Sequence, residues 1–147
     1  MGAKTIFLDF DGVLHPSDAC DEPGKGLRAF VWAYELLRAI GQEPVDLVVH
    51  SDWRVFYTLD QLRSMAPWHL SEKIAKTVAS DVPKAMAIEQ AVAEWGIDDF
   101  LVLDDEPVQF KGIDLFAGKV IECDPYEGVS CPSVQRRISL WLAGGPR

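Results

Sequence analysis

The fold of this 147-residue chain is most readable from one stretch near its N-terminus, Thr5-Ile6-Phe7-Leu8-Asp9-Phe10-Asp11-Gly12-Val13-Leu14-His15-Pro16. The apolar, β-forming residues before Asp9 predict a buried strand, and Gly12 directly after Asp11 predicts a sharp exit into a loop. Such a strand would carry two carboxylates to the edge of a sheet. Taken alone, the same pattern also describes a strand followed by an acidic turn, so the remaining sequence has to decide between these interpretations.

Two further apolar runs also end in polar side chains. Residues 45–50 are nearly all apolar, as parallel strands buried on both faces are, and Ser51-Asp52-Trp53-Arg54 follows them. Residues 100–103 are followed by Asp104-Asp105-Glu106-Pro107. We also predict strands within residues 73–79 and over residues 119–123.

The spacing of apolar residues predicts four helices between and after these strands. The first ends at Gly41, the second covers about residues 55–65 and stops near Pro67, and the third begins near Pro83 and ends at Gly96. The apolar positions are Leu27, Phe30, Val31, Tyr34 and Leu37 in the first helix, Ala85, Ile88, Val92 and Trp95 in the third, and Val134, Ile138, Trp141 and Leu142 in the last.

Strands therefore alternate with helices along the whole chain. This order predicts an α/β fold, a single three-layer α/β/α Rossmann-like domain over residues 1–147 with a central parallel sheet. In such folds ligands bind beyond the carboxyl ends of the strands. The polar pairs that follow the predicted strands are Asp9 and Asp11, Ser51 and Asp52, and Asp104 and Asp105. We expect them to share one site.

Composition restricts the class of protein. Apolar residues make up 48% of the chain and charged residues 25%, which is ordinary for a soluble globular protein. No apolar run is long enough to span a membrane, and no signal-peptide pattern precedes the first strand. Cys20, Cys123 and Cys131 have no metal-binding spacing, so we expect reduced thiols and a cytoplasmic protein. The net charge of −9 disfavours generic nucleic-acid binding.

A cluster of aspartates at one sheet edge indicates phosphoryl chemistry with a metal ion. Converging carboxylates are costly to keep ionised without a cation, and Mg²⁺ suits them because it binds carboxylates, water and a phosphate oxygen. One aspartate can attack a phosphoryl group, while a second protonates the leaving oxygen and then activates water. A hydroxyl and a cationic side chain would hold the other phosphoryl oxygens. The sequence contains no Gly-x-x-x-x-Gly-Lys loop, which excludes a P-loop.

Four strings, in order along the chain, carry a resemblance to a known family. They are Asp9-Phe10-Asp11-Gly12-Val13-Leu14, Val48-Val49-His50-Ser51, Lys84 at a helix start, and Leu101-Val102-Leu103-Asp104-Asp105. They resemble the motifs of the haloacid-dehalogenase (HAD) superfamily of phosphohydrolases. The strings Ser51-Asp52-Trp53-Arg54, Leu103-Asp104-Asp105-Glu106 and Leu140-Trp141-Leu142 look closest to a small capless subgroup, which is similar to the phosphatase domains of RNA-repair (Swiss-army-knife) proteins. A response-regulator receiver fits less well, because the second strand here ends in serine.

The resemblance implies a role for each matching residue. Asp9 would be the nucleophile and a metal ligand, and Asp11 the general acid and base, with its backbone carbonyl on the metal. Lys84 would steady the nucleophile and the phosphate. Asp105 would bind Mg²⁺ directly, and Asp104 would be a further ligand or a support for it. The predicted substrate-binding residues are Ser51, Asp52, Arg54 and Gly12.

Several of these residues have simpler interpretations that the sequence leaves open. Ser51 could be only a helix cap, and Asp104 or Asp105 could likewise be an N-cap. Lys73 or Lys76 could take the place of Lys84. Arg54 could clamp a phosphate or pair with Asp52 or Glu106. Trp53 could stack on a base or simply pack, and His15 could shape the leaving-group side or have no special role.

The segments between the motifs are too short for a large lid domain. Family-level reasoning therefore suggests an open site for a phosphorylated macromolecule or polynucleotide end, with small phosphate esters also compatible. The function that we expect is a Mg²⁺-dependent phosphatase that works through an aspartyl-phosphate on Asp9. The alternatives are a catalytically silent HAD-fold binding or regulatory module, and phosphoryl transfer to an acceptor other than water.

Overall fold

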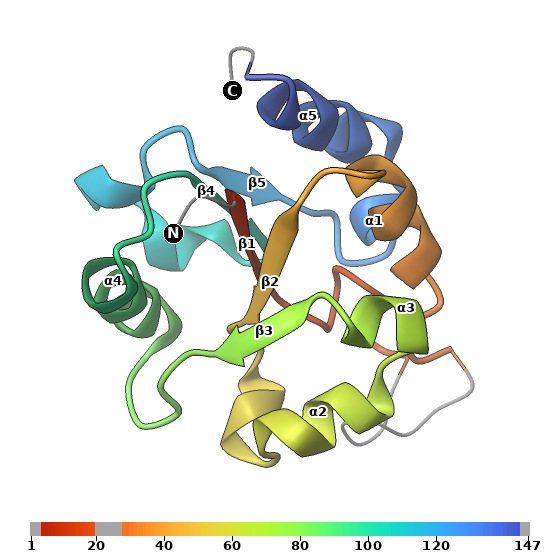
Figure 1. The fold of residues 1–147 in the computed structure, drawn as a ribbon, viewed down its shortest axis with the longest axis horizontal. Helices are drawn as coiled ribbons and strands as arrows, with labels where there is room; N and C mark the ends of the chain where they lie inside the picture. The colour runs from red at the N-terminus through yellow and green to blue at the C-terminus, as the bar shows by residue number, and fades with distance from the viewer. Residues whose placement is uncertain (1–3, 20–27, 145–147) are drawn as a thin grey trace.

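A computed structural model of the chain describes residues 4–19 and 28–144. Two residues named above, Cys20 and Leu27, lie outside the described residues, as does the end of the loop that we predict from about His15 to Lys25. Five strands form one parallel sheet: β1 (Lys4–Leu8), β2 (Val45–Val49), β3 (Ile74–Thr77), β4 (Phe100–Asp104) and β5 (Val120–Glu122). Their order across the sheet is β3-β2-β1-β4-β5, so β1 lies at the centre (Figure 1). The predicted parallel sheet is confirmed.

The strand register aligns the carboxyl ends of the three central strands. Leu8 is level with Val49 of β2 and with Leu103 of β4. The backbone N–H of Asp9 donates to Leu103 O at 3.2 Å, and that of His50 donates to Leu8 O at 3.1 Å. The residues that follow β1, β2 and β4 therefore leave the sheet side by side.

Helices cover both faces of the sheet. The α-helices are α1 (Ala33–Ile40), α2 (Leu59–Met65), α3 (Trp68–Ser71), α4 (Lys84–Trp95) and α5 (Pro132–Leu142), and short 3₁₀ turns are η1 (Asp52–Val55), η2 (Pro107–Phe110), η3 (Asp114–Phe116) and η4 (Gly128–Ser130).

The two faces carry separate hydrophobic cores because β1 side chains alternate across the sheet. Ile6 and Leu8 join the core that contains residues of α1, α2, α3 and α5. Phe7 joins the other core, which contains residues of α4, η2 and η3. Figure 1 shows α4 on one side of the sheet and α1 and α5 on the other. The predicted three-layer α/β/α arrangement is confirmed.

The first predicted helix differs from the observed one in its start and in its buried face. The helix α1 begins only at Ala33, after a turn in which Phe30 is buried with a positive φ of 59°. Its buried side chains include Leu36 and Ile40, whereas the predicted face residues Val31 and Tyr34 are exposed. The apolar spacing of residues 27–37 crosses a turn, so the helix that follows the turn buries a different face from the one that this spacing predicts.

The second predicted helix, over about residues 55–65, is in fact two elements. Ser51 caps the 3₁₀ turn η1, and α2 begins at Leu59. Thr58 and Gln61 form a capping box, in which each side chain bonds the other residue's backbone N–H, and this starts the new helix. The later helices follow the prediction more closely: α4 begins at Lys84 after Pro83 and ends at Gly96.

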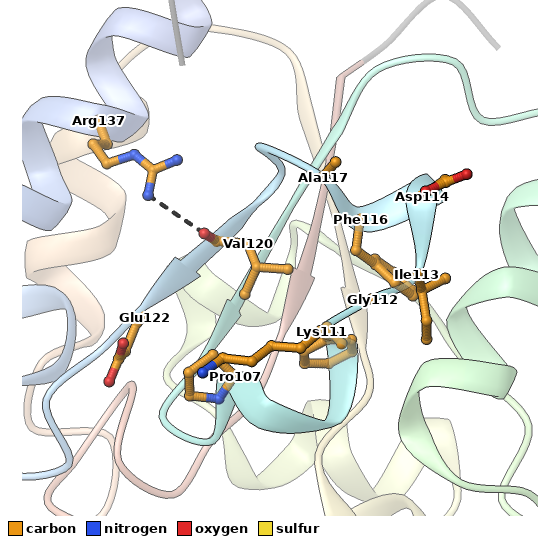
Figure 2. A pocket seen from close by; sticks show the side chains of 11 residues that line it. Pro107, Lys111, Gly112, Ile113, Asp114, Phe116, Ala117, Val120, Glu122 and Arg137 are labelled. Atoms are coloured by element: carbon orange, nitrogen blue, oxygen red, sulfur yellow. Dashed lines mark hydrogen bonds between the residues drawn. The ribbon is translucent and has the colours of Figure 1, made fainter.

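The exposed edge of the sheet is partly closed by a side chain. Arg137 of α5 donates to the backbone carbonyl of Val120 in β5 at 3.4 Å, which occupies one of the unpaired groups of this edge strand (Figure 2). Throughout residues 4–19 and 28–144, no helix combines the length and the apolar character that a membrane span needs.

Candidate active site

Asp9 occupies the centre of the carboxyl edge of the sheet. It follows the central strand β1 directly, and only 3% of the residue is exposed. Its Oδ1 accepts a hydrogen bond from the backbone N–H of Phe10 at 2.9 Å, and its Oδ2 lies 3.5 Å from Nζ of Lys84. The nucleophile predicted from the sequence therefore lies beside a cation at the carboxyl edge of the sheet.

Three carboxylates converge here. Asp9, Asp104 and Asp105 each offer an oxygen, and these oxygens all lie within 4.8 Å of one another. Burial, and then the negative charge of Asp104, raise the pKa of Asp9 well above its usual range, although Lys84 opposes the shift. Burial and Asp104 likewise raise the pKa of Asp105 to about 6. Carboxylates that resist ionisation in this way fit a divalent cation, which would favour their charged forms.

Asp104 is held almost entirely by the protein. Its Oδ2 contacts Nε2 of His50 at 2.8 Å and Nζ of Lys84 at 3.3 Å, and its Oδ1 accepts from the backbone N–H of Glu106 at 2.8 Å. Burial alone would raise the pKa of Asp104, but the hydrogen bond with His50 and the nearby charges outweigh it and lower that pKa. With both oxygens engaged in this way, Asp104 is better placed to support the cluster than to donate an open ligand.

Asp105, unlike Asp104, is partly exposed. Its side chain is half-buried and lies directly over Gly12, where an added Cβ would come 2.6 Å from the Asp105 Cγ. Gly12 has a positive φ of 78°, a conformation that glycine adopts without steric cost. The absence of a side chain at Gly12 thus lets Asp105 approach Asp9.

Lys84 is the first residue of α4 and connects the two buried acids. Burial alone would lower its pKa, but the charges of Asp9 and Asp104 outweigh this and raise it, so Lys84 stays a cation. The competing lysines lie elsewhere: Lys76 is stacked over the Trp95 ring at 4.3 Å, and Lys73 lines a different hollow with Tyr34 and His69.

The carboxylate of Asp11 contacts two side chains that come from different parts of the chain. His15 Nε2 lies 2.7 Å from Oδ1, and the indole N–H of Trp53 donates to Oδ2 at 3.0 Å. Burial alone would raise the pKa of Asp11, but these two hydrogen bonds outweigh it and lower that pKa. Both partners are fully or almost fully buried. Packing of Trp53, one of its two predicted roles, is thus observed.

The chain is similar to one described family over most of its length. A family model described as the HAD domain in Swiss Army Knife RNA repair proteins matches residues 5–134. The chain belongs to this family. Neither a curated protein nor a solved structure matches it.

The turn after β2 in this HAD domain is built around a buried arginine. Ser51 Oγ accepts from the backbone N–H of Trp53 at 3.2 Å, so the serine does cap the turn; its own O–H hydrogen can still be donated to a ligand. Arg54 donates to four backbone carbonyls, namely those of His50, Ser51, Ala79 and Val82, at 2.8–3.3 Å. Its guanidinium also lies 3.6 Å from the exposed Asp52 carboxylate. A phosphate-binding role for Arg54 stays a prediction, because these carbonyls already engage most of its donors.

A cavity of about 450 Å³ opens beside Lys84. Its lining includes Asp52, Val55, Asp81, Glu106 and Gln109, which come from the turn after β2, the segment before α4 and the segment after β4. A hollow of similar size, about 470 Å³, lies along η2, η3 and β5 between Lys111, Asp114 and Arg137 (Figure 2). None of the three converging aspartates lines either hollow. Lys84, which contacts Asp9 and Asp104, lines the cavity of about 450 Å³ and not the hollow of Figure 2, so we place the site of the HAD domain beside Lys84.

Sequence reasoning missed His50 as a member of the site. Its ring is fully buried, with Nε2 on Asp104, and burial lowers its pKa despite that partner. The other ring nitrogen, Nδ1, has no hydrogen-bond partner among the described residues. The position of His50, between an apolar strand and Ser51, could have indicated a residue of the site. Its contact with Asp104, however, depends on the pairing of β2 with β1 and of β1 with β4, which the sequence does not show.

Proposed function

We propose that this HAD domain is a Mg²⁺-dependent phosphatase that hydrolyses phosphoric monoesters through an aspartyl-phosphate on Asp9. The observation that carries the proposal is the buried Asp9 carboxylate on the central strand, with Lys84 Nζ at 3.5 Å and the oxygens of Asp104 and Asp105 close by. Membership of a HAD family supports the same reaction class.

The donor set fits a magnesium ion. Asp9 and Asp105 would hold the ion, with Asp104 supporting them and the backbone carbonyl of Asp11 as a further oxygen ligand. When bound, Mg²⁺ would offset the charge between the attacking carboxylate and the anionic phosphoryl group. Lys84, bonded to Asp104 and close to Asp9, keeps a positive charge at the same position.

The reaction proceeds in two displacements at phosphorus. The first step requires Asp11 in its protonated form, which its lowered pKa makes a minor fraction at neutral pH. A carboxylate oxygen of Asp9 attacks the phosphorus, the phosphorus–ester oxygen bond breaks, and the protonated Asp11 gives its proton to the leaving oxygen. Water then attacks the phosphorus of the aspartyl-phosphate and gives a proton to Asp11, and the bond between Asp9 and phosphorus breaks to release inorganic phosphate. The Ser51 hydroxyl and the Lys84 ammonium hold the non-transferring oxygens.

The substrate class that we propose is a phosphorylated polynucleotide end. The family to which the chain belongs is named for RNA-repair proteins, and a cavity of about 450 Å³ opens beside Lys84, a residue of the proposed site. Phosphate charges beyond the reacting one would meet Asp52, Asp81 and Glu106 in the cavity wall. We therefore expect the terminal phosphate to enter the cavity while the remaining backbone stays outside it.

Replacement of the nucleophile tests the function. Asp9→Asn should abolish phosphate release from p-nitrophenyl phosphate and from phosphate-ended oligonucleotides in Mg²⁺, because the amide cannot form the phosphoenzyme. Asp60→Asn, at an exposed carboxylate of α2, is the matched control and should retain full activity. Beryllium fluoride should form an adduct with the wild type and Mg²⁺ but not with Asp9→Asn. Retained turnover in Asp9→Asn would refute the covalent mechanism, and an inactive wild type would refute the phosphatase.

A further inference from the structure

The Asp11 carboxylate is held at both of its oxygens by buried donors. His15 lies on Oδ1 and Trp53 on Oδ2, at 2.7 Å and 3.0 Å. A carboxylate offers about four acceptor directions, so each oxygen keeps one direction for another partner. The Asp11 side chain is 43% exposed, whereas the His15 side chain is fully buried. The protein thus holds the carboxylate through two buried donors and leaves part of it exposed to solvent.

The His15 ring is itself oriented. The backbone N–H of Phe30 donates to Nδ1 of His15 at 3.1 Å, so this nitrogen must offer a lone pair and the ring hydrogen lies on Nε2, facing Asp11. Phe30 has a positive φ of 59°, which is uncommon for a bulky residue. The backbone strain places a donor where the histidine needs one, and strain of this kind clusters at functional sites.

The Trp53 indole is fixed by packing. Its ring lies against Phe10 at 5.1 Å, Phe30 at 5.6 Å and His15 at 5.5 Å between centroids. Only 1% of the residue is exposed. An indole enclosed on several sides has little freedom to turn, so its N–H direction is set before any substrate binds.

We propose that His15 and Trp53 are positioning residues that hold the Asp11 carboxyl group for its two proton transfers, to the leaving oxygen and from the attacking water. This inference rests on the proposed function. Neither side chain would touch the phosphoryl group; both act through Asp11. A misplacement of the acid by about 1 Å is enough to cost roughly 100-fold in rate, so a carboxyl group free to rotate would transfer protons poorly.

Two esters that differ in their need for a proton test this role. Phenyl phosphate has a poor leaving group, whereas the nitrophenolate of p-nitrophenyl phosphate departs without protonation. We expect His15→Leu to lower kcat/KM for phenyl phosphate by roughly 100-fold and that for p-nitrophenyl phosphate by less than about 10-fold, in line with the usual size of general acid catalysis. His15→Gln, which retains an N–H donor of similar reach, should recover part of the loss for phenyl phosphate.

A matched pair of tryptophan variants separates positioning from packing. Trp53→Phe removes the donor to Asp11. Trp141→Phe removes a similarly buried indole whose N–H also donates to a carboxylate, that of Asp99 at 2.7 Å, but near the opposite edge of the sheet. Trp53→Phe should change the ratio of kcat/KM between the two esters, whereas Trp141→Phe should leave that ratio unchanged even if it lowers stability.

The outcomes distinguish the inference from the proposed function. If the wild type cleaves both esters but the His15 and Trp53 variants slow them equally, the positioning role is wrong and the phosphatase stands. If the wild type cleaves no phosphoester, both fall together. A measurement without turnover covers variants that fail to fold: the Trp53 indole N–H resonance should shift in Asp11→Asn, and an unchanged resonance would overturn the contact on which the inference depends.

Discussion

Gly12 shows how one missing side chain lets the carboxylates of the proposed metal site converge. A Cβ at this position would overlap the Asp105 carboxyl group, and the positive φ would strain any other residue as well. The glycine that follows Asp11 was read from the sequence as a sharp exit from the strand. Gly12 also leaves space for the Asp105 side chain. This second role involves a residue more than ninety positions later and can be recognised only in the folded chain.

The change Gly12→Ala should weaken metal binding. The methyl group would push Asp105 away from Asp9, and displacement of a supporting contact typically costs about 10–100-fold in metal affinity. Titration calorimetry with Mg²⁺ or Mn²⁺ measures this directly. Gly96→Ala is the control, because Gly96 has a comparable φ of 62° but no atom within 4 Å of the added methyl group. Gly96→Ala should lower the free energy of unfolding by about 1 kcal/mol and leave the metal affinity unchanged. If both variants lost metal affinity equally, backbone strain rather than displacement of Asp105 would explain the loss.

The positions of the site residues could be predicted where each residue directly follows a predicted strand. Asp9 and Asp105 converge as expected because each follows a strand that the apolar pattern had already marked. Arg54 is different, because its four carbonyl partners include those of Ala79 and Val82, which belong to the segment before α4. No pattern near Arg54 indicates that this segment passes beside it. The contact of Trp53 with Asp11, 42 positions earlier in the chain, could not be predicted for the same reason.

At the scale of elements, strands were easier to predict than helices. A strand buried on both faces is a continuous apolar run, and β1, β2 and β4 each show one. A helix has to be read from periodicity, which fails when the pattern crosses a turn, as it does before Ala33. The start of α2 could have been found, because Thr58 and Gln61 have the spacing of a capping box.

Arg54 connects two elements, and its loss should destabilise the fold. Arg54→Met would leave carbonyls of η1 and of the segment before α4 without their donor, which we expect to lower the free energy of unfolding by about 2–4 kcal/mol. Urea unfolding in phosphate-free buffer measures this change. Arg63→Met is the matched control: Arg63 donates to the carbonyls of Ile74 and Ala75, but its side chain is 38% exposed. Arg63→Met should lower the free energy of unfolding by about 1 kcal/mol or less. Unchanged stability in Arg54→Met with a raised KM would instead favour phosphate binding.

At the scale of the whole molecule, negative charge is concentrated where the proposed reaction needs a cation. The chain has a net charge of −9, and the central strand directs a buried carboxylate toward two others. Such a cluster destabilises the metal-free fold when it is ionised. The arrangement therefore couples metal binding to stability, because an ion that binds only the folded chain stabilises it by mass action.

This coupling predicts a pH dependence that Mg²⁺ should reverse. The pKa of Asp105 is raised to about 6, from about 3.9 in an unfolded chain, and that of Asp9 is also raised. Each of these groups contributes stability while it is protonated and loses that contribution as the pH rises through its folded pKa. Asp11 and Asp104, whose pKa values are lowered, contribute above about pH 3.9 and lose their contribution only in stronger acid.

The raised pKa of Asp105 should therefore lower the melting temperature of the metal-free protein between about pH 4 and pH 6, whereas His50, whose pKa is lowered by burial, raises stability as the pH approaches about 6.5. Over this window the melting temperature of the wild type should fall relative to that of Asp105→Asn. Added Mg²⁺ should raise the melting temperature most at pH 7, where the carboxylates are ready to bind, and little at pH 4.5. Asp105→Asn removes one titrating group. It should therefore reduce both the dependence of the melting temperature on pH and the increase in melting temperature that Mg²⁺ causes. Differential scanning calorimetry in EDTA and in Mg²⁺ measures both. The same pH dependence of the melting temperature in the wild type and in Asp105→Asn, measured in EDTA, would contradict this account of the carboxylate cluster.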